Sequence, residues 1–173
     1  MRKVIKQNFF NRPTLKVAKE LLGKFLVRKI GKEELAGKIT EIEAYVGFKD
    51  KASHASHGRT ERTKVMFGKP GQWYVYLIYG MHYCLNIVTE KEHFPAAVLI
   101  RAVDNTKGPG RVAKYFHIDK SLNNTPAGKR GGLWIEERGL NLKPSDIKRE
   151  KRIGVEYAGK YKDKLWRFYL ADK

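Results

Sequence analysis

Residues 73–88, WYVYLIYGMHYCLNIV, carry the densest β-strand signal in the chain. β-Branched and aromatic residues fill this segment, and the glycine of Tyr79-Gly80-Met81 interrupts it at its centre, as the tip of a hairpin would. Because side chains alternate along a strand, Trp73, Val75 and Leu77 share one face, and Tyr74, Tyr76 and Ile78 share the other. Both faces are bulky, so we expect a buried central hairpin with aromatic cross-strand pairs.

Further strands are predicted on both sides of this hairpin, over residues 24–30, 34–45, 96–103, 133–137, 153–155 and 166–170. Helices are predicted over residues 13–22 and 111–118, the first with proline in its opening turn and Gly23 at its end. A chain of 173 residues, 42% of them apolar, can build one core but is short for two. The predicted fold is mixed α+β and β-rich, a single domain over residues 1–173 around a curved antiparallel sheet.

Two polar stretches stand apart from these elements. Residues 46–71 are rich in Gly, His, Lys and Arg and lack apolar periodicity, which predicts a long ordered loop of the kind that carries function. Residues 143–152 hold a run of charges, which indicates a solvated segment facing water or phosphates.

The charge balance predicts a polyanionic partner. The chain has 36 Lys and Arg against 18 Asp and Glu, a net charge of +18 at pH 7. Nucleic acid is favoured, although a membrane surface or a ribosomal site would use the same charge. Cys84 is the only cysteine, which excludes an intramolecular disulfide and fits a reducing compartment such as the cytoplasm. No segment has the apolar length of a transmembrane helix.

A strand with two carboxylates is the first candidate for chemistry. Glu41, Glu43 and Tyr45 lie two apart and so point to one face, which is either a solvated edge or a catalytic rim. An ionised carboxylate there could act as a general base toward water. Arg101 interrupts an apolar run and needs a partner, either one of these carboxylates or a phosphate.

Histidines and tyrosines supply the other candidates. His54 and His57 have the spacing of only half a metal site, and the nearby Arg59 and Arg62 disfavour a cation, so we expect no metal. Tyr79 at the predicted tip would gain little burial in a core, which indicates a wedge inserted between base pairs. Tyr76 offers a ring on which a base could stack.

Several blocks in order resemble one known family. The blocks are EIEAYVG, SHASHGRTER, MFGKPGQWYVYLIYGMHYCLN, VLIRAV, GPGR, LWIEERG and RIGVEYAGKYKDKLWRFYL. Over nearly the whole chain they are similar to the alkyladenine (3-methyladenine) DNA glycosylases of mammals and many bacteria. The resemblance implies an open barrel like the C-terminal domain of formyltransferases, with a β-hairpin that protrudes into DNA.

The resemblance also implies residue roles. Glu43 matches the glutamate that deprotonates the attacking water, and Arg101 matches an arginine beside that water. The base pocket is matched by Tyr45, His54, Tyr76 and Asn86, the last at a floor that screens out normal guanine. Tyr79 matches the tyrosine inserted into the minor groove, and further DNA contacts are expected from Gly80, Met81, Arg59, Arg62 and Arg111.

The chain departs from the family pattern at two places in its expected DNA contacts. Arg62-Thr63 stands where an arginine–asparagine pair is common, and Gly108-Pro109-Gly110-Arg111 stands where GPGK is common. Arg111 keeps the positive charge, whereas Thr63 changes a side chain that could order the loop or bond its backbone.

The implied activity is monofunctional base removal. Water attacks the flipped nucleotide, a purine of the 3-methyladenine, 7-methylguanine, hypoxanthine or ethenoadenine class leaves, and an abasic site remains. No metal, cofactor or lysine Schiff base is expected, and the partner is duplex DNA with damaged purines. We expect a monomer, cytoplasmic and nucleoid-associated if bacterial. The alternatives are a non-catalytic protein that kinks DNA or binds lesions, and a basic RNA-binding protein.

Overall fold

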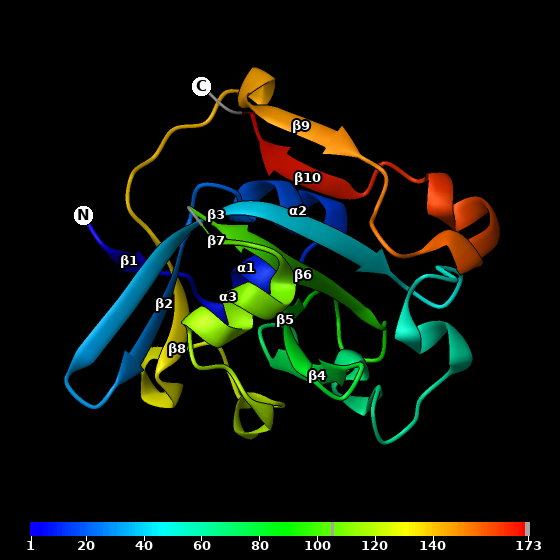
Figure 1. Ribbon diagram of the computed structural model, residues 1–173, viewed down its shortest axis with the longest axis horizontal. Coiled ribbons are helices and arrows are strands. Elements are labelled where there is room, and N and C mark those ends of the chain that lie inside the picture. The colour runs from blue at the N-terminus through cyan, green and yellow to red at the C-terminus, as the bar shows by residue number, and fades with distance from the viewer. Residues whose placement is uncertain (105, 172–173) are drawn as a thin grey trace.

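Strands make up most of the regular structure in the computed structural model, which describes residues 1–104 and 106–171 (Figure 1). They are β1 (Lys3–Val4), β2 (Phe25–Ile30), β3 (Glu33–Val46), β4 (Trp73–Ile78), β5 (His82–Val88), β6 (Ala96–Val103), β7 (Thr106–Lys107), β8 (Leu133–Glu137), β9 (Ile147–Glu150) and β10 (Arg167–Leu170). Within the described residues they form one ten-stranded sheet in the main order β1-β8-β2-β3-β6-β5-β4. Every neighbouring pair is antiparallel.

The helices are short. The α-helices are α1 (Gln7–Phe10), α2 (Thr14–Leu21) and α3 (Pro109–Tyr115), and the 3-10 helices are η1 (His54–His57), η2 (Lys64–Phe67), η3 (Lys120–Leu122), η4 (Lys129–Gly131), η5 (Pro144–Asp146) and η6 (Glu156–Asp163). The predicted β-rich fold with an antiparallel sheet and a few helices is confirmed, and the likeness to an open formyltransferase barrel stays a prediction. Among the described residues, no helix combines the length and apolar character needed to cross a bilayer.

β3 is the strand around which the sheet is organised. Its first part pairs with β2, and its second part pairs with β6 on one side and with β10 on the other. The register between β3 and β6 shifts on both sides of Glu41, so that Glu41 faces Ala102 while the next residue, Ile42, faces Ile100. Arg101 is thus an extra residue on β6. Such irregularities bend a strand and re-aim a side chain, and here they turn Arg101 toward the acidic residues of β3.

The main core lies between the sheet and the helices α2 and α3. Val17, Ala18 and Leu21 of α2 are fully buried, as are Trp73, Phe10 and Phe116, the largest side chains of this core. α2 ends where the sequence predicts, because Gly23 takes the positive φ of 78° that stops a helix. On the hairpin formed by β4 and β5, Trp73 and Val75 join this core, whereas Tyr74 and Tyr76 turn to a second apolar cluster on the other face.

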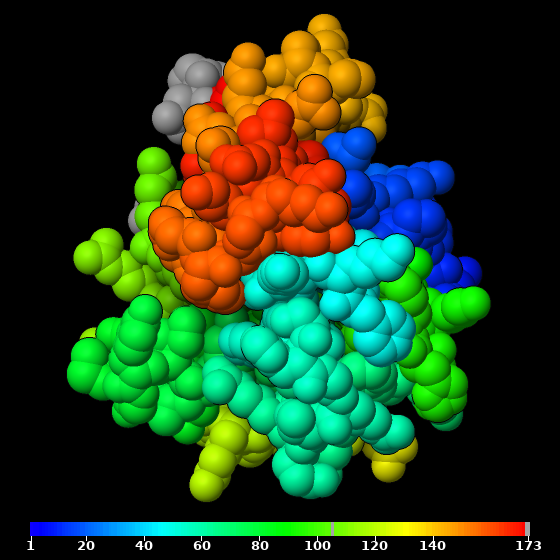
Figure 2. Space-filling model, turned by 90° about the vertical axis from the view of Figure 1, so that its right-hand side faces the viewer, coloured from blue at the N-terminus to red at the C-terminus, as the bar shows by residue number. Residues whose placement is uncertain are grey.

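Two predictions about the C-terminal part are wrong. Residues 153–155 form bends and not a strand, because Gly154 has a φ of 73° and the amide of Ile153 bonds to a side chain of β3. Residues 143–152 are not wholly a solvated segment, since they contain β9 and end at the buried Arg152. The short elements α1, β1 and β9 were not predicted from the sequence. β9 pairs with β10, which pairs with β3, and the C-terminal segment lies beside the loop after β3 (Figures 1 and 2).

Candidate active site

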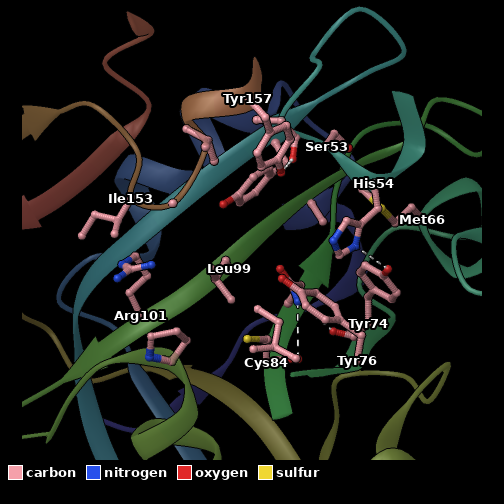
Figure 3. A pocket seen from close by; sticks show the side chains of 18 of the residues that line it. Ser53, His54, Met66, Tyr74, Tyr76, Cys84, Leu99, Arg101, Ile153 and Tyr157 are labelled. Carbon is pink, nitrogen blue, oxygen red and sulfur yellow. Dashed lines mark hydrogen bonds between the residues drawn. The ribbon is translucent and has the colours of Figure 1, made fainter. Parts of the chain in front are cut away.

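A pocket opens where the second half of β3 meets the β4–β5 hairpin, β6 and the C-terminal segment (Figure 3). Its inner part is made of buried side chains, Met66, Tyr74, Cys84, Asn86, Ala97 and Leu99. Its outer part holds the exposed side chains of Tyr79, Ile153 and Tyr157. Tyr45, Ala52, Ser53, His54, Tyr76, Ile78, Arg101, Pro109, Gly154 and Val155 complete the lining. The pocket therefore presents both polar and apolar surface, and aromatic side chains lie at its rim.

Glu43 lies directly behind the pocket wall with none of its surface exposed. One carboxylate oxygen accepts from the Tyr45 hydroxyl at 2.7 Å, and the other accepts from the backbone amide of Ile153 at 2.8 Å. Arg101 approaches with Nη1 at 3.5 Å from the first oxygen. All three partners line the pocket. An ionised carboxylate only accepts hydrogen bonds, so these donors suit its charged form.

Arg101 joins the two carboxylates of β3. Its Nε lies 3.2 Å from Glu41 Oε1, and its Nη1 faces Glu43. The same Glu41 oxygen also receives Arg167 Nη1 at 3.0 Å. Of the partners left open by the sequence, Arg101 contacts both carboxylates. Glu41 therefore fixes the arginine from behind while Glu43 meets it at the pocket.

The opposite wall is a cluster of rings. His54 Nδ1 lies 3.1 Å from the Tyr74 hydroxyl, and the His54 ring meets the Tyr76 ring edge-on with 4.7 Å between centroids. Figure 3 shows these three side chains together on one side and Arg101 with Ile153 on the other. Burial raises the pKa of Tyr74 to about 12 and raises the pKa of Tyr76 further, so both hydroxyls stay protonated. This wall is electron-rich and uncharged.

His54 is also neutral at physiological pH. Burial, followed by the charges of Arg62 and His57, lowers the pKa of His54 from 6.5 to about 4. A neutral imidazole can face a cationic base without repelling it.

We expect His54 to make stability depend on pH between these two values. The unfolded chain takes up a proton on His54 below about pH 6.5 and the folded chain does so only near pH 4, so the free energy of unfolding should rise as pH rises through this window. Urea unfolding of the parent and of His54→Gln at several pH values checks this. Equal pH dependence in the two proteins would contradict it.

Tyr45 is held by a buried ion pair that the sequence did not reveal. The guanidinium of Arg152 lies 4.8 Å from the Tyr45 ring centroid and pairs with Asp50 at 2.6 Å. Neither charged side chain is exposed. Burial raises the pKa of Tyr45 well above its usual value, which keeps its hydroxyl available as a donor to Glu43.

The hairpin tip between β4 and β5 is strained and exposed. The Met81 amide donates to the Ile78 carbonyl at 3.0 Å, and both residues between them have positive φ, 50° at Tyr79 and 65° at Gly80. Positive φ at both central residues is typical of type I′ turns, but it is unfavourable for a tyrosine. The Tyr79 side chain is 91% exposed. Strain kept at an exposed aromatic residue indicates a function at this position.

Comparison with known proteins places these residues in a family. A family model described as methylpurine-DNA glycosylase (MPG) matches residues 8–107 and 104–173. The chain belongs to the methylpurine-DNA glycosylase family.

Curated relatives of this family match nearly the whole chain. A Legionella pneumophila (strain Lens) protein is 50% identical, and the match covers 95% of this chain and 92% of the relative. A Methanocella arvoryzae protein is 45% identical, with 96% of this chain and 92% of the relative covered. A Clostridium tetani protein is 41% identical, with 97% of this chain and 96% of the relative covered. All three carry the name "Putative 3-methyladenine DNA glycosylase".

The structure gathers most of the site residues expected of such a glycosylase. Tyr45, His54, Tyr76, Tyr79, Asn86 and Arg101 line one pocket, and Glu43 lies behind it. The Asn86 amide nitrogen donates to the Tyr74 carbonyl at 3.1 Å, which fixes this side chain in the inner part of the pocket. The remaining expected DNA contacts, Arg59, Arg62, Gly80, Met81 and Arg111, are outside the pocket lining and exposed.

The departure at Arg62-Thr63 has a structural account. The buried Thr63 hydroxyl donates to the Gly58 carbonyl at 2.9 Å and accepts from the Thr60 amide at 2.8 Å. The loop before η2 is thus closed by a threonine that bonds the backbone. Beside it, the guanidinium of Arg62 lies 5.1 Å from the Tyr76 ring centroid. This positive charge is therefore held next to the aromatic wall.

Sequence reasoning missed several residues of this glycosylase pocket. Ile153 and Tyr157 come from a segment predicted as a strand or left unassigned, and the Asp50–Arg152 pair joins residues far apart in the chain. The only signal at Arg152, Ile153 and Tyr157 was the block RIGVEYAG, which carries part of the family resemblance.

Proposed function

We propose that this chain is a monofunctional DNA glycosylase that hydrolyses the N-glycosidic bond of alkylated or deaminated purines flipped out of duplex DNA. The substrate class is 3-methyladenine, 7-methylguanine, hypoxanthine and ethenoadenine, and the product is an abasic site in an uncut strand. The whole chain, residues 1–173, acts as one domain and as a monomer. The observation that carries the proposal is the fully buried Glu43 carboxylate, held by three donors behind an aromatic pocket.

The proposed reaction begins with a water held between Glu43 and the sugar of the flipped nucleotide. As the glycosidic bond breaks, its electron pair leaves with the base and positive charge develops at C1′, which the carboxylate stabilises. The water oxygen bonds to C1′ and Glu43 accepts the water proton. A base that carries positive charge, such as 3-methyladenine, departs neutral and needs no proton from the enzyme. A neutral base, such as hypoxanthine, departs as an anion and takes its proton from water. Arg101, tied to Glu41, keeps the carboxylate oriented toward the water.

The aromatic wall would select the base. Tyr45 and Tyr76 present electron-rich rings beside the neutral His54, and each ring already has one guanidinium near it, Arg152 at Tyr45 and Arg62 at Tyr76. Such rings attract a cationic purine by about 0.5–2 kcal/mol, depending on how much water is excluded. Asn86, whose amide nitrogen bonds to the Tyr74 carbonyl, would reject a normal guanine. The net charge of +18 supports binding of the DNA backbone by exposed residues, among them Arg59, Arg62 and Arg111.

The decisive experiment is incubation of the protein with DNA that has been treated with a methylating agent. Chromatography should identify free 3-methyladenine or another alkylated purine, and the strand should break only after alkali treatment. A strand cut without alkali would contradict a monofunctional enzyme. Binding without base release would favour a protein that only kinks DNA, and preference for structured RNA over an abasic-site duplex would favour an RNA-binding protein.

Tyr79 is proposed to fill the space left by the flipped nucleotide. Tyr79→Ala should slow base release from a well-paired duplex by about tenfold or more, because extrusion costs a few kcal/mol and the wedge holds the duplex open. Single-turnover release measures this effect. Binding to undamaged duplex should keep its affinity and its salt dependence, since phosphate contacts dominate it. An unchanged release rate would argue against a wedge.

A further inference from the structure

The pocket has a floor and a mouth that differ in burial. Asn86 and Leu99 at the floor are each 3% exposed, whereas Tyr79, Tyr157 and Ile153 at the mouth are 91%, 68% and 52% exposed. A nucleotide that swings out of a duplex turns about its backbone, so its base goes deepest and its sugar stays near the surface. Residues at the mouth are therefore placed to meet the sugar and the flanking backbone.

Tyr157 stands at this mouth on an element other than the hairpin. It belongs to η6, in the C-terminal segment, whereas Tyr79 comes from the turn between β4 and β5. Figure 3 shows the Tyr157 side chain beside Ser53, and the space-filling view shows the C-terminal segment, in orange to red, against the loop in cyan. The two exposed tyrosines thus come from separate walls of one opening.

The Tyr157 ring is exposed and yet held in place. Its hydroxyl donates to the Ala52 carbonyl at 3.3 Å, on the loop that carries His54. A large aromatic side chain left in water gains no burial energy, but one that is already ordered loses little conformational freedom when a ligand covers it. Tyrosines of this kind are common where one face of the ring meets a partner.

We propose that Tyr157 is a substrate-binding residue that packs against the sugar of the extruded nucleotide. The inference rests on the proposed function, because it needs a nucleotide to leave the duplex. It adds a contact from the C-terminal segment to those of the sheet and the hairpin. Within the described residues Tyr157 bonds to Ala52, whereas Glu43 is held by Tyr45, Ile153 and Arg101, so the effect of Tyr157 should fall on binding.

The test uses binding to a duplex with one tetrahydrofuran abasic-site analogue, compared with an undamaged duplex of the same sequence. This probe has a sugar to extrude but no base and no bond to hydrolyse. Tyr157→Ala should weaken binding to the abasic duplex by about tenfold, the usual worth of an aromatic contact to a nucleotide. Binding to the undamaged duplex should change by less than about twofold, because phosphate contacts determine it.

Two further variants distinguish a direct contact of the Tyr157 ring with DNA from a purely structural role of its hydrogen bond to Ala52. Tyr157→Phe keeps the ring but loses the bond to Ala52 that orders it, so it should lose much less affinity for the abasic duplex than Tyr157→Ala loses. Tyr169→Ala is the matched control, since it removes a tyrosine whose hydroxyl donates to Glu150 and which does not line the pocket. It should leave both affinities unchanged. Should Tyr157→Ala unfold, Tyr157→Leu keeps apolar volume without the ring and should show the same selective loss.

Three results would overturn the inference. They are an equal loss on both duplexes, a loss in Tyr157→Phe as large as in Tyr157→Ala, and no loss in any variant. Base release by the parent distinguishes this failure from that of the proposed function. A parent that releases alkylated bases while Tyr157→Ala binds normally overturns only the role of Tyr157, whereas a parent with selective, Tyr157-dependent binding and no release overturns only the glycosylase activity.

Discussion

Glu43→Gln should abolish base release and leave DNA binding almost intact. A positioned general base contributes about 10²–10⁴-fold to rate, and glutamine cannot accept the water proton, so single-turnover release should fall by that factor. The amide keeps an oxygen for the Ile153 amide or for the Tyr45 hydroxyl. Affinity for a tetrahydrofuran duplex should therefore stay close to that of the parent. Release by the variant at the parent's rate would remove Glu43 from the mechanism.

Glu41→Gln is the matched control for this result. Glu41 lies on the same strand and contacts the same arginine, but its carboxylate accepts from Arg101 and Arg167, whereas that of Glu43 accepts from Tyr45 and Ile153 of the pocket lining. Its substitution loosens Arg101 without removing the proposed base. We expect a loss of release much smaller than that of Glu43→Gln. If the two variants lose equally, the effect lies in the orientation of Arg101 and not in proton transfer.

The two strands and the turn of the hairpin could be predicted because their signal is local. The expected central position with aromatic cross-strand pairs was wrong, since β4 ends the main strand order and its aromatic residues face Ile87, Asn86 and Cys84 on β5. Alternation over residues 73–88 is enough to sort Trp73 and Val75 from Tyr74 and Tyr76, and the structure places these pairs in different clusters. The glycine at the centre marks the turn. Neither inference needs any contact outside the segment. Whether a tyrosine of this hairpin packs in the core or is free to stack on a base cannot be predicted from the segment alone, because it depends on which residues of other elements cover each face of the hairpin.

The partner of Arg101 could not be decided from the sequence, because a sheet irregularity determines it. In an unbroken register Arg101 would have one residue opposite it on β3. The shift around Glu41 leaves it without such a partner and turns it to both carboxylates. Bulges depend on how two distant strands pair, and this information is absent from either strand alone.

The contacts of the C-terminal segment were also not predictable, because they join residues far apart in the sequence. Ile153 reads as a strand residue beside Val155, yet its amide bonds to Glu43, 110 residues earlier in the chain. Arg152 ends a run of charges and would be solvated on composition alone, but it meets Asp50 across 102 residues. Local pattern predicts burial from neighbours in sequence. It cannot show that an acidic residue of another element will pair with an arginine and bury it.

Asp50→Ala should destabilise the fold strongly. Asp50 accepts from Arg152 Nη1 at 2.6 Å and from Nη2 at 2.8 Å, and neither side chain is exposed. The alanine variant leaves a guanidinium buried with only the carbonyls of Ala44 and Tyr161 as acceptors. Breaking a buried pair from one side costs about 3–5 kcal/mol, so urea unfolding at pH 7 should show a loss of that size. Asp163→Ala breaks an exposed pair with Lys151 and should change the free energy of unfolding little.

The double variant Asp50→Ala/Arg152→Met separates stability from positioning. Removing both charges takes away the unpaired cation, and replacement of a buried pair by apolar groups is often neutral for stability. The part of the free energy of unfolding that the unpaired cation costs in Asp50→Ala should therefore return, whereas the part due to the Val46 and Ala52 amides, which also donate to Asp50, should not. Arg152 also stacks on the Tyr45 ring, and the Tyr45 hydroxyl donates to Glu43, so the ring loses its support in both variants. Base release that stays low in a double variant of restored stability would mean that the pair serves to hold Tyr45 against Glu43, the proposed general base. Release that recovers together with stability would mean that the pair acts on the fold alone.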